Sequence, residues 1–301
     1  MQVISHEQVE SVLRMEDLIP LMRETMIDFS RGKIEQPPRR ILSVENHSGY
    51  FGSMPAVSEQ ALGAKLVSFY PANDSRKLPT HMAKIVLFKP ETGEPLAIID
   101  GDLITEMRTA AVSAAFIDAV ADKAVTSLAL IGAGVQARSH LQALRLVRQF
   151  KDIRICNRNI ARARELAESV NGRVMEHEEA VSDADVVVAA TASTEPVFDG
   201  AWLKPGAKVV SVGWAGADAG ELDAQTMAYE VVVDSIEGAM TESGNVRRYQ
   251  LQVNTELGEV LAGNKKFAAD SIVVFESIGM ACQDLASASM VLGKLAAGTG
   301  V

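Results

Sequence analysis

The chain has few of the residues that build disulfide-bonded or metal-dependent folds. Its 301 residues include only two cysteines, Cys156 and Cys282, and five histidines. Two cysteines are too few for a disulfide framework, and no Cys/His cluster has the spacing of a metal-ligand set. We therefore expect no metal site.

Positive charge is also scarce. The chain carries 29 Lys and Arg residues against 39 Asp and Glu residues, which gives a net charge of −10. A net acidic chain is a poor candidate for binding nucleic acid or an anionic membrane. Aromatic residues make up only 5%, so stacking platforms for single-stranded nucleic acid are not expected. A small molecule is the expected partner.

Long uncharged apolar runs are absent as well. No such stretch approaches the roughly 18–20 residues that a membrane helix needs. The start of the chain lacks the basic residues and the apolar run of a signal peptide. We expect a cytoplasmic protein without membrane contact. The hydrophobic content of 48% is ample for one large core or two ordinary ones.

Strand-like and helical runs alternate in the second half of the chain. Helical patterns cover residues 135–147 and 160–170. Short β-branched runs, bounded by turn residues, cover 125–131, 153–157, 186–190, 208–212, 231–234 and 272–276. This alternation predicts a parallel sheet with right-handed crossovers.

The first part of the chain has a different pattern. Residues 63–70 alternate like a strand, and residues 84–100 read as a hairpin with a glycine turn. An Ala-rich helical stretch runs from Thr109 to about residue 120, and an Ala/Leu/Met-rich helix closes the chain from about residue 280. We predict an α+β domain with an antiparallel sheet.

A glycine-rich turn follows the first strand of the second half. Residues 128–137 read Leu-Ala-Leu-Ile-Gly-Ala-Gly-Val-Gln-Ala, a G-x-G-x-x-A pattern between a predicted strand and a predicted helix. Gly132 permits the tight turn, Gly134 lets backbone approach a pyrophosphate, and Ala137 lets helix and strand pack closely. This context favours a Rossmann-type dinucleotide domain over a turn without a ligand. The predicted cofactor residues here are Gly132, Ala133, Gly134, Val135 and Gln136.

The end of the second strand indicates which dinucleotide binds. NAD enzymes usually place Asp or Glu there, to accept a hydrogen bond from the ribose 2′-hydroxyl. Here the strand ends Asn157-Arg158-Asn159, and a guanidinium can pair with a 2′-phosphate. NADP(H) is therefore favoured over NAD(H), with a solvated Arg158 as the alternative. The cofactor site is predicted to include Asn157, Arg158, Asn159, Thr191, Ala192, Ser193 and Val212.

A hydride-transfer site also needs groups that hold the substrate. In the first part, residues 36–40 carry two arginines on a rigid extended segment, Lys65 interrupts an apolar strand, and His81 starts a strand. Arg108 opens the predicted Ala-rich helix, where the macrodipole favours anions. Converging Arg and Lys side chains bind a carboxylate, although each alone is equally well explained as a solvated surface residue.

Together these segments resemble the ornithine cyclodeaminase/μ-crystallin family over essentially the whole chain. The matching runs are 36–39, 53–56, 64–70, 100–105, 108–114, 132–137, 221–223, 242–244 and 277–281. The resemblance implies a homodimer. It also implies an N-terminal substrate-binding and dimerisation domain, joined by the C-terminal helix, and a Rossmann domain that binds NAD(P). We place the first at residues 1–115 with 285–301, and the second at residues 116–284.

The same resemblance implies roles for single residues. Three cations match positions that hold an amino-acid carboxylate: Arg39, Lys65 and Arg108. Thr109 matches a residue near the cofactor phosphates, and Ser277 and Gly279 match the loop beside the nicotinamide. We assign Lys65 and Arg108 to catalysis, and we add Met54 and His81 to the substrate site.

Three departures from the family pattern bear on the reaction. After the strand that corresponds to residues 208–212, the cyclodeaminases and related archaeal alanine dehydrogenases carry a motif similar to Val-Gly-x-Asp. Here Ala215 takes the position of that Asp, and the nearby carboxylate is Asp218. Cyclodeaminases carry a Glu at the place of Gly52. Their second strand also ends in Asp, whereas Asn157-Arg158 resembles the NADPH-using members. Cyclisation with ammonia loss needs a resident base and tightly held NAD⁺, and both are missing or altered.

The sequence therefore favours NADPH-dependent reduction of a small α-imino acid to the L-amino acid. The cyclic candidates are Δ1-pyrroline-2-carboxylate and Δ1-piperideine-2-carboxylate, with Lys65 at the imine nitrogen. The alternatives are an open-chain imine reductase or alanine-dehydrogenase-type enzyme, an ornithine cyclodeaminase, and a non-catalytic ligand-binding protein. Intact Arg39, Lys65 and Arg108 argue against the last, because a purely structural protein needs no charged cleft.

Overall fold

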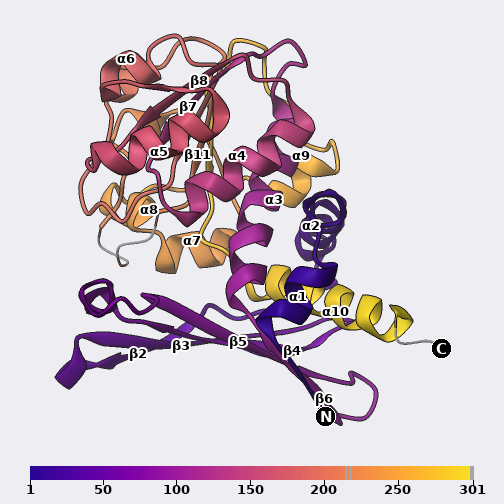
Figure 1. Ribbon diagram of the computed structural model, residues 1–301. Helices are drawn as coiled ribbons and strands as arrows, with labels where there is room; N and C mark the ends of the chain where they lie inside the picture. The colour runs from indigo at the N-terminus through magenta and orange to yellow at the C-terminus, as the bar shows by residue number, and fades with distance from the viewer. Residues whose placement is uncertain (214–215, 217–218, 299–301) are drawn as a thin grey trace. The chain divides into compact units, whose positions relative to one another are not determined.

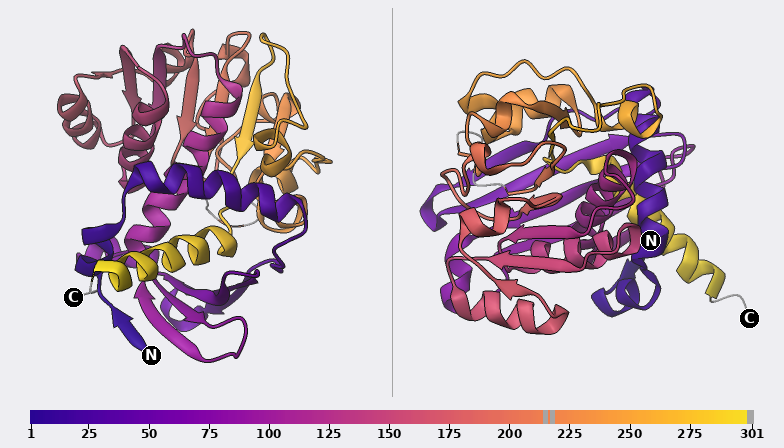
Figure 2. Two further views of the ribbon diagram at one scale, coloured as in Figure 1. Left: turned by 90° about the vertical axis from the view of Figure 1, so that its right-hand side faces the viewer. Right: turned by 90° about the horizontal axis from the view of Figure 1, so that it is seen from above.

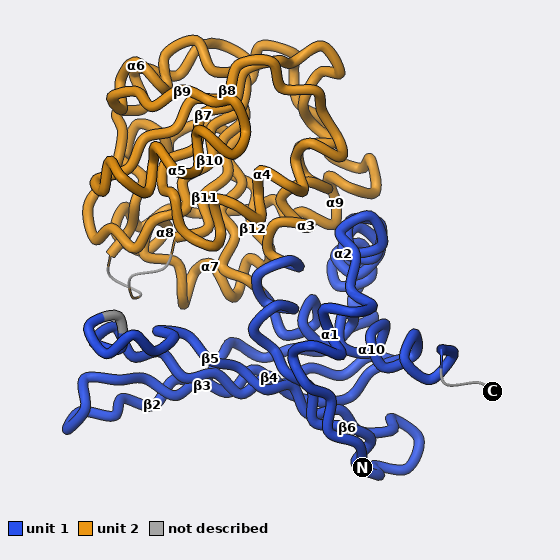
Figure 3. The backbone as a smooth tube through the Cα atoms, viewed as in Figure 1, with its two compact units in different colours: residues 1–108, 280–301 blue, residues 109–279 orange. Residues whose placement is uncertain are grey.

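The computed structural model describes residues 1–298 apart from 214, 215, 217 and 218, and it divides into two compact units. Unit 1 comprises Met1–Arg108 and Met280–Val301, and unit 2 comprises Thr109–Gly279 (Figure 3). Unit 1 is α+β and unit 2 is built on a parallel sheet, which confirms the predicted fold class. The sequence placed the boundaries after residues 115 and 284, and the roles given to the two domains stay predictions.

Unit 1 combines one sheet with helices from both ends of the chain. Its helices are α1 (His6–Val12), α2 (Met15–Ser30) and α10 (Ala281–Gly298), with short 3-10 turns at Glu45–His47 and Pro71–Arg76. Its strands are β1 (Gln2–Ile4), β2 (Arg40–Val44), β3 (Gly49–Val57), β4 (Leu62–Phe69), β5 (His81–Phe88) and β6 (Pro95–Asp100). Helix α3 (Asp102–Val120) begins in unit 1 and continues into unit 2.

The strands of unit 1 form one six-stranded sheet in the order β1-β6-β5-β4-β3-β2. Neighbours from β2 to β6 pair antiparallel, and β5 and β6 form the expected hairpin, with Gly93 at a φ of 72°. The prediction of an antiparallel sheet is wrong at one edge, because β1 pairs parallel with β6. The short N-terminal strand reaches that edge from outside the meander, so no hairpin constrains its direction.

One face of this sheet packs against α10, and the other carries partly exposed apolar side chains. Helix α10 contacts β3, β4 and β5, and also α1 and α2; Figures 1 and 2 show it lying along the sheet. On the covered face, Ile85 and Leu87 of β5 are buried. The opposite face includes Leu42, Phe51, Val57 and Met82, whose exposed fractions are 54, 41, 37 and 38%.

Unit 2 is built on a seven-stranded sheet in the order β12-β13-β11-β10-β7-β8-β9, with every neighbouring pair parallel. Its strands are β7 (Ser127–Ile131), β8 (Asp152–Cys156), β9 (Arg173–Val174), β10 (Val186–Ala189), β11 (Lys208–Ser211), β12 (Glu230–Val233) and β13 (Val273–Glu276). Except for the two-residue β9, these lie within the predicted runs or start one residue before them.

The helices of unit 2 cover a core in which Val187, Val209 and Val274 are fully buried. They are α4 (Val135–Val147), α5 (Ile160–Val170), α6 (His177–Val181), α7 (Ile236–Glu242), α8 (Gly244–Arg248) and α9 (Leu257–Leu261), with 3-10 turns at Gly200–Trp202 and Thr226–Ala228. Helices α4 and α5 have the predicted bounds. The helices of one or two turns carry too little periodicity to be recognised from sequence.

Helix α3 starts earlier than the sequence suggested. The Ala-rich pattern placed Arg108 at the positively polarised N-terminus. The helix instead begins at Asp102, whose carboxylate accepts a hydrogen bond of 2.6 Å from the Ala83 N–H. Arg108 therefore lies inside the helix, beyond its first turn, and the argument from the helix macrodipole was wrong. Side-chain contacts in unit 1 hold Arg108 in place instead.

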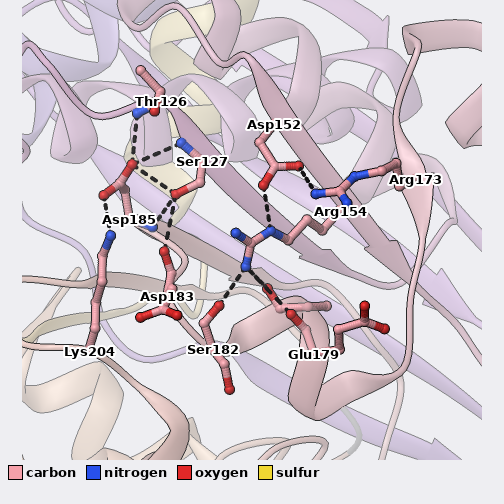
Figure 4. Close-up of polar contacts among 11 residues, drawn as sticks. Thr126, Ser127, Asp152, Arg154, Arg173, Glu179, Ser182, Asp183, Asp185 and Lys204 are labelled. Carbon is pink, nitrogen blue, oxygen red and sulfur yellow. Dashed lines mark hydrogen bonds and ion pairs between the residues drawn. The ribbon is translucent and has the colours of Figure 1, made fainter.

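The amino ends of the parallel strands are tied together by polar contacts (Figure 4). Asp185, just before β10, accepts from the N–H groups of Thr126 (2.7 Å) and Ser127 (2.9 Å) and pairs with Lys204 (2.6 Å). Burial raises the pKa of Asp185, but these partners outweigh it and lower the pKa to about 2. Arg154 donates to the carbonyl of Ser182, the C-cap of α6, at 2.5 Å. The contacts at this edge stabilise the sheet, and the opposite edge carries the predicted cofactor residues.

Candidate active site

Two of the predicted substrate-binding cations meet at one buried carboxylate in unit 1. Lys65 projects from β4, Arg108 from α3 and Asp284 from α10. The Lys65 Nζ lies 2.6 Å from Asp284 Oδ2, and Arg108 Nε donates to Asp284 Oδ1 at 2.9 Å. The three side chains are 3, 5 and 0% exposed, respectively. Both cations were predicted from the sequence, whereas Asp284 was not among the predicted residues.

The preceding residue of α10 also holds Arg108. Gln283 Oε1 accepts hydrogen bonds from Arg108 Nη1 (2.7 Å) and from the Met280 N–H (3.2 Å). The Gln283 Nε2 lies 3.3 Å from Met26 Sδ on α2. Two consecutive residues of α10 therefore fix the guanidinium of Arg108, so its orientation is set before any ligand arrives.

The cluster carries a surplus of positive charge. Burial lowers the pKa of the Lys65 ammonium; Asp284 opposes this effect, Arg108 and Arg39 add to it, and the resulting pKa is about 8. Burial raises the pKa of Asp284, but Arg108 and Lys65 lower it below its ordinary value. Within the group of Lys65, Arg108 and Asp284, two cations therefore face one carboxylate at neutral pH, and this balance favours an anionic ligand.

The other predicted substrate residues lie on neighbouring strands of unit 1. Met54 on β3 pairs in register with Lys65 and is 4% exposed. His81 is the first residue of β5; burial, and then the charge of Lys65, lower its pKa to about 4, so its imidazole is neutral near pH 7. Arg39 precedes β2 and is close enough to lower the pKa of Lys65. The structure thus groups the predicted substrate residues.

In unit 2, the G-x-G-x-x-A turn joins β7 to α4 as predicted. Gly132 adopts a φ of 117°, which L side chains rarely adopt, and its N–H donates to the Cys156 carbonyl at 2.8 Å. A Cβ at Gly132 would lie 2.5 Å from the Ala190 carbonyl oxygen, whereas a Cβ at Gly134 would meet no described atom within 4 Å. Gly134 is the N-cap of α4. A turn that is closed at Gly132 and open at Gly134 fits a pyrophosphate at the helix N-terminus.

Local bonds organise the turn that follows β8. Asn157 Nδ2 donates to the Asn159 carbonyl at 2.9 Å. Asn159 Oδ1 accepts from the Arg162 N–H at 3.2 Å and caps α5. Arg158 stands between the two asparagines and is exposed. The turn therefore presents a guanidinium where NAD enzymes usually present a carboxylate.

The other predicted cofactor residues follow the carboxyl ends of parallel strands. They are Thr191, Ala192 and Ser193 after β10, Val212 after β11, and Ser277 and Gly279 after β13. The carboxyl ends of parallel strands meet at one edge of a sheet, where dinucleotides bind in such folds. This is also the edge of the turn after β7, which holds Ala133, and of the first residues of α4, Val135 and Gln136.

Thr109, predicted to lie near the cofactor phosphates, is connected to the dinucleotide helix within unit 2. Its carbonyl accepts a hydrogen bond from Ser113 Oγ at 3.1 Å. Ser113 Oγ also lies 2.9 Å from His140 Nε2 on α4. Burial lowers the pKa of His140 to about 4, so its ring is neutral and this contact is a hydrogen bond between uncharged groups. These bonds hold the part of α3 that belongs to unit 2 against α4.

Two buried carboxylates hold the loops at the cofactor edge, and neither is among the residues predicted for the site from the sequence. Glu221 accepts from the Thr191 N–H at 2.9 Å and from Thr191 Oγ1 at 2.6 Å. Asp234 accepts from Ser277 Oγ at 3.1 Å and from the Gly279 N–H at 2.8 Å. Each joins loops that are far apart in the chain, so no local pattern reveals them.

Three further findings concern what the described residues contain. No group of three or more His, Cys, Asp or Glu residues among 1–213, 216 and 219–298 has the arrangement of a metal site. No helix in this part of the chain has both the length and the apolarity to cross a bilayer. Ala215 and Asp218, which the sequence analysis compared with the catalytic Asp of relatives, lie outside the described residues.

The parallel sheet, its glycine turn and the buried cation cluster define an NAD(P)H-dependent oxidoreductase of two units. The chain belongs to the ornithine cyclodeaminase/mu-crystallin family, whose model matches residues 1–299. This membership confirms the resemblance that the sequence motifs carried. The turn after β7 and the neighbouring loops at the same edge of the sheet fit a nicotinamide dinucleotide as the cofactor.

Known relatives cover nearly the whole chain. Ketimine reductase mu-crystallin of Mus musculus is 39% identical over 305 residues, which span 98% of this chain and 97% of the mouse protein. The Thermococcus litoralis Delta(1)-pyrroline-2-carboxylate reductase, solved with NADH and L-proline, matches with a TM-score of 0.94, 33% identity and coverage of 100 and 99% of the two chains. An archaeal alanine dehydrogenase dimer with bound NAD matches with a TM-score of 0.92, 29% identity and coverage of 100 and 98%.

Proposed function

We propose that this chain reduces a small cyclic α-imino acid, Δ1-pyrroline-2-carboxylate or Δ1-piperideine-2-carboxylate, to the L-amino acid with NADPH. The observation that carries this proposal is the buried cluster of Lys65, Arg108 and Asp284, whose surplus positive charge suits a substrate carboxylate. The ketimine and pyrroline-2-carboxylate reductases among the relatives support the same chemistry.

The residues of unit 1 have separable tasks in this reaction. Arg108 and Arg39 bind the substrate carboxylate, and Arg108 is already oriented for that contact by Gln283 and Asp284. Lys65, with a pKa of about 8, is mostly an ammonium at neutral pH and can donate a proton to the imine nitrogen. The bound cofactor supplies the hydride that adds to the imine carbon. Hydride and proton together convert C=N to CH–NH.

The limited space at Gly52 on β3 disfavours a cyclodeaminase. Gly52 occupies the place where cyclodeaminases carry a Glu, and a Cβ added there would lie 3.0 Å from Val67 Cγ1 on β4. Any larger side chain at this position therefore requires Val67 to move. An open-chain imine reductase remains the second candidate function, because the archaeal alanine dehydrogenase matches over the full length of this chain.

The function is tested by following NADPH oxidation with a panel of imines. The panel contains pyrroline-2-carboxylate, piperideine-2-carboxylate, and pyruvate with ammonia or methylamine, each repeated with NADH; ornithine with NAD⁺, assayed for ammonia, completes it. We expect turnover of a cyclic ketimine with NADPH. Turnover only of pyruvate with an amine would establish the open-chain reaction, and NADPH binding without turnover of any imine would refute the proposed reaction.

The cofactor preference is proposed to rest on Arg158. Replacing Arg158 by Asp removes the partner of the 2′-phosphate and supplies an acceptor for the ribose hydroxyl. A charge-assisted hydrogen bond is worth about 1.5–3 kcal/mol, so we expect the ratio of kcat/KM for NADPH to that for NADH to fall about 10- to 100-fold. Arg164→Asp, an equally exposed charge reversal on α5, is the control. An unchanged ratio in Arg158→Asp would show that Arg158 does not contact the 2′-phosphate.

A homodimer is proposed to form through the open face of the unit 1 sheet. That face presents partly exposed apolar side chains, including Leu42, Phe51 and Met82, and such patches mark protein contacts. The dimer of the archaeal alanine dehydrogenase supports a second copy as the occupant. Sedimentation should give a dimer for the wild type and a monomer for Phe51→Lys. Leu146→Lys, at an exposed apolar residue of α4, should stay dimeric; a monomeric wild type contradicts the proposal.

A further inference from the structure

Asp284 is a fully buried carboxylate to which the reaction above gives only the orientation of Arg108, and its contact with Lys65 is left without a role. It lies in the first turn of α10, and its side chain is 0% exposed. Each of its oxygens faces a different cation: Oδ2 lies 2.6 Å from Lys65 Nζ, and Oδ1 accepts from Arg108 Nε at 2.9 Å. These cations come from β4 and α3, so one carboxylate connects three separate elements of unit 1.

Stability alone is a weak explanation for this arrangement. Removing charges from water costs several kcal/mol per ion, and replacing a buried ion group by apolar residues of similar volume is often neutral or stabilising. The arrangement also leaves the cluster with more positive than negative charge, which a purely structural ion group does not need. What the carboxylate does provide is a fixed direction for the two cations it touches and a negative charge that favours the protonated form of Lys65.

We propose that Asp284 is a positioning residue for the imine reduction, which holds the Lys65 ammonium and the Arg108 guanidinium in the arrangement that receives the substrate. The inference rests on the proposed function for its substrate. Asp284 acts through Lys65 and Arg108 and does not itself touch the substrate. Its neighbour Gln283 holds the second nitrogen of Arg108 at 2.7 Å, so α10 sets both the place and the plane of that guanidinium.

The same carboxylate keeps Lys65 protonated. Among the described residues, the charged groups with the largest effect on Lys65 are Asp284 from α10, Arg108 from α3 and Arg39 from the segment before β2; His81 from β5 is neutral. Burial, Arg108 and Arg39 all lower the pKa of Lys65, and only Asp284 among these groups raises it. Without Asp284, the pKa of Lys65 is therefore expected to lie below its value of about 8.

The test compares Asp284→Asn with wild type in two measurements. Protein labelled with ¹³C-lysine reports the titration of Lys65 by NMR, with the signal assigned by its loss in Lys65→Arg. In parallel, kcat/KM for the ketimine is measured against pH. We expect the wild-type midpoint and the alkaline fall of kcat/KM near pH 8, because the ammonium is the active form and kcat/KM reports the free enzyme. In Asp284→Asn both move to lower pH, and kcat falls by roughly 10²-fold.

Two further variants make the result specific. Asp100→Asn removes a carboxylate that pairs with Lys84 on the same sheet, and it should leave the Lys65 midpoint unchanged. Asp284→Glu keeps the charge and lengthens the side chain, so we expect a midpoint near that of wild type with a lower kcat. If Asp284→Asn fails to fold, Asp284→Glu decides the matter, because wild-type kcat in that variant overturns a positioning role.

The outcomes separate this inference from the proposed function. A folded Asp284→Asn variant with the wild-type Lys65 midpoint and pH profile would show that the carboxylate is merely structural, whatever its melting temperature. A shifted midpoint in a protein that turns over no ketimine would refute the proposed substrate and leave the control of Lys65 by Asp284 standing. A shifted midpoint together with a shifted pH profile supports both.

Discussion

Replacing Lys65 by methionine is expected to lower kcat/KM for a cyclic ketimine by roughly 10²–10⁴-fold, the range over which a positioned proton donor contributes to catalysis. Methionine keeps a buried apolar side chain of similar length at this position of β4, and the variant lacks only the ammonium. The cluster also loses one of the charges that attract the substrate carboxylate. The NADPH Kd should stay near the wild-type value, because the predicted cofactor residues belong to other strands and loops.

The matched control for this variant is Lys84→Met. Lys84 lies on β5 of the same sheet, pairs with Asp100 at 2.5 Å and has a side chain that is 58% exposed. Its removal should change kcat/KM little, because Lys84 lies opposite Leu66 in the register and so projects from the face of the sheet opposite to Lys65. Steady-state kinetics with both variants give the comparison. Equal kcat/KM in Lys65→Met and wild type would remove Lys65 from the reaction.

Replacing Gly132 by alanine is expected to damage both the fold and cofactor binding. The backbone φ of 117° is strained for any L side chain, at a cost of about 1–3 kcal/mol. The new Cβ would also lie 2.5 Å from the Ala190 carbonyl oxygen, so the turn after β7 must move relative to the loop after β10. We expect a lower melting temperature and a raised NADPH Kd, measured by thermal unfolding and by fluorescence titration.

Gly134→Ala separates these two effects. A Cβ at Gly134 meets no described atom of the protein within 4 Å, so the melting temperature without cofactor should stay close to that of wild type. The same methyl intrudes on the predicted pyrophosphate site, and overpacking of this kind costs about 1–3 kcal/mol, or about a 5- to 150-fold rise in the NADPH Kd. Normal NADPH affinity in Gly134→Ala would place the pyrophosphate elsewhere.

The parallel-sheet unit could be predicted from sequence because its signals are local. Except for the two-residue β9, each strand of unit 2 is a short and mostly apolar run, and α4 and α5 repeat apolar residues at the helical period. In unit 1 the local signal is poorer: β3 contains Gly49, Gly52 and Pro55, which weaken strand propensity. An added Cβ at Gly49 would lie 2.4 Å from the ring of Tyr70, the residue after β4, so packing against this ring favours a glycine.

The candidate site was predicted in its cations and missed in its anion. Lys65 and Arg108 were recognisable because a charge is unexpected in an apolar strand and at an Ala-rich helix. Asp284 offered no such contrast, because an acidic residue in the first turn of a helix is ordinary. Its partner Arg108 is 176 residues away in the sequence, and only the folded chain shows the pair. Arg108 itself was found for a partly wrong reason, since the helix begins at Asp102.

The division of unit 1 between the two ends of the chain sets the order in which the protein can be completed on the ribosome. Domains generally fold during synthesis with the N-terminal one first. Here the N-terminal residues of unit 1 emerge early, yet α10 is made after all the other described helices. Until it emerges, Lys65 and Arg108 lack the carboxylate of Asp284. The dinucleotide unit can therefore finish folding first, and a chain that stops before α10 ends without the anion around which its two cations assemble.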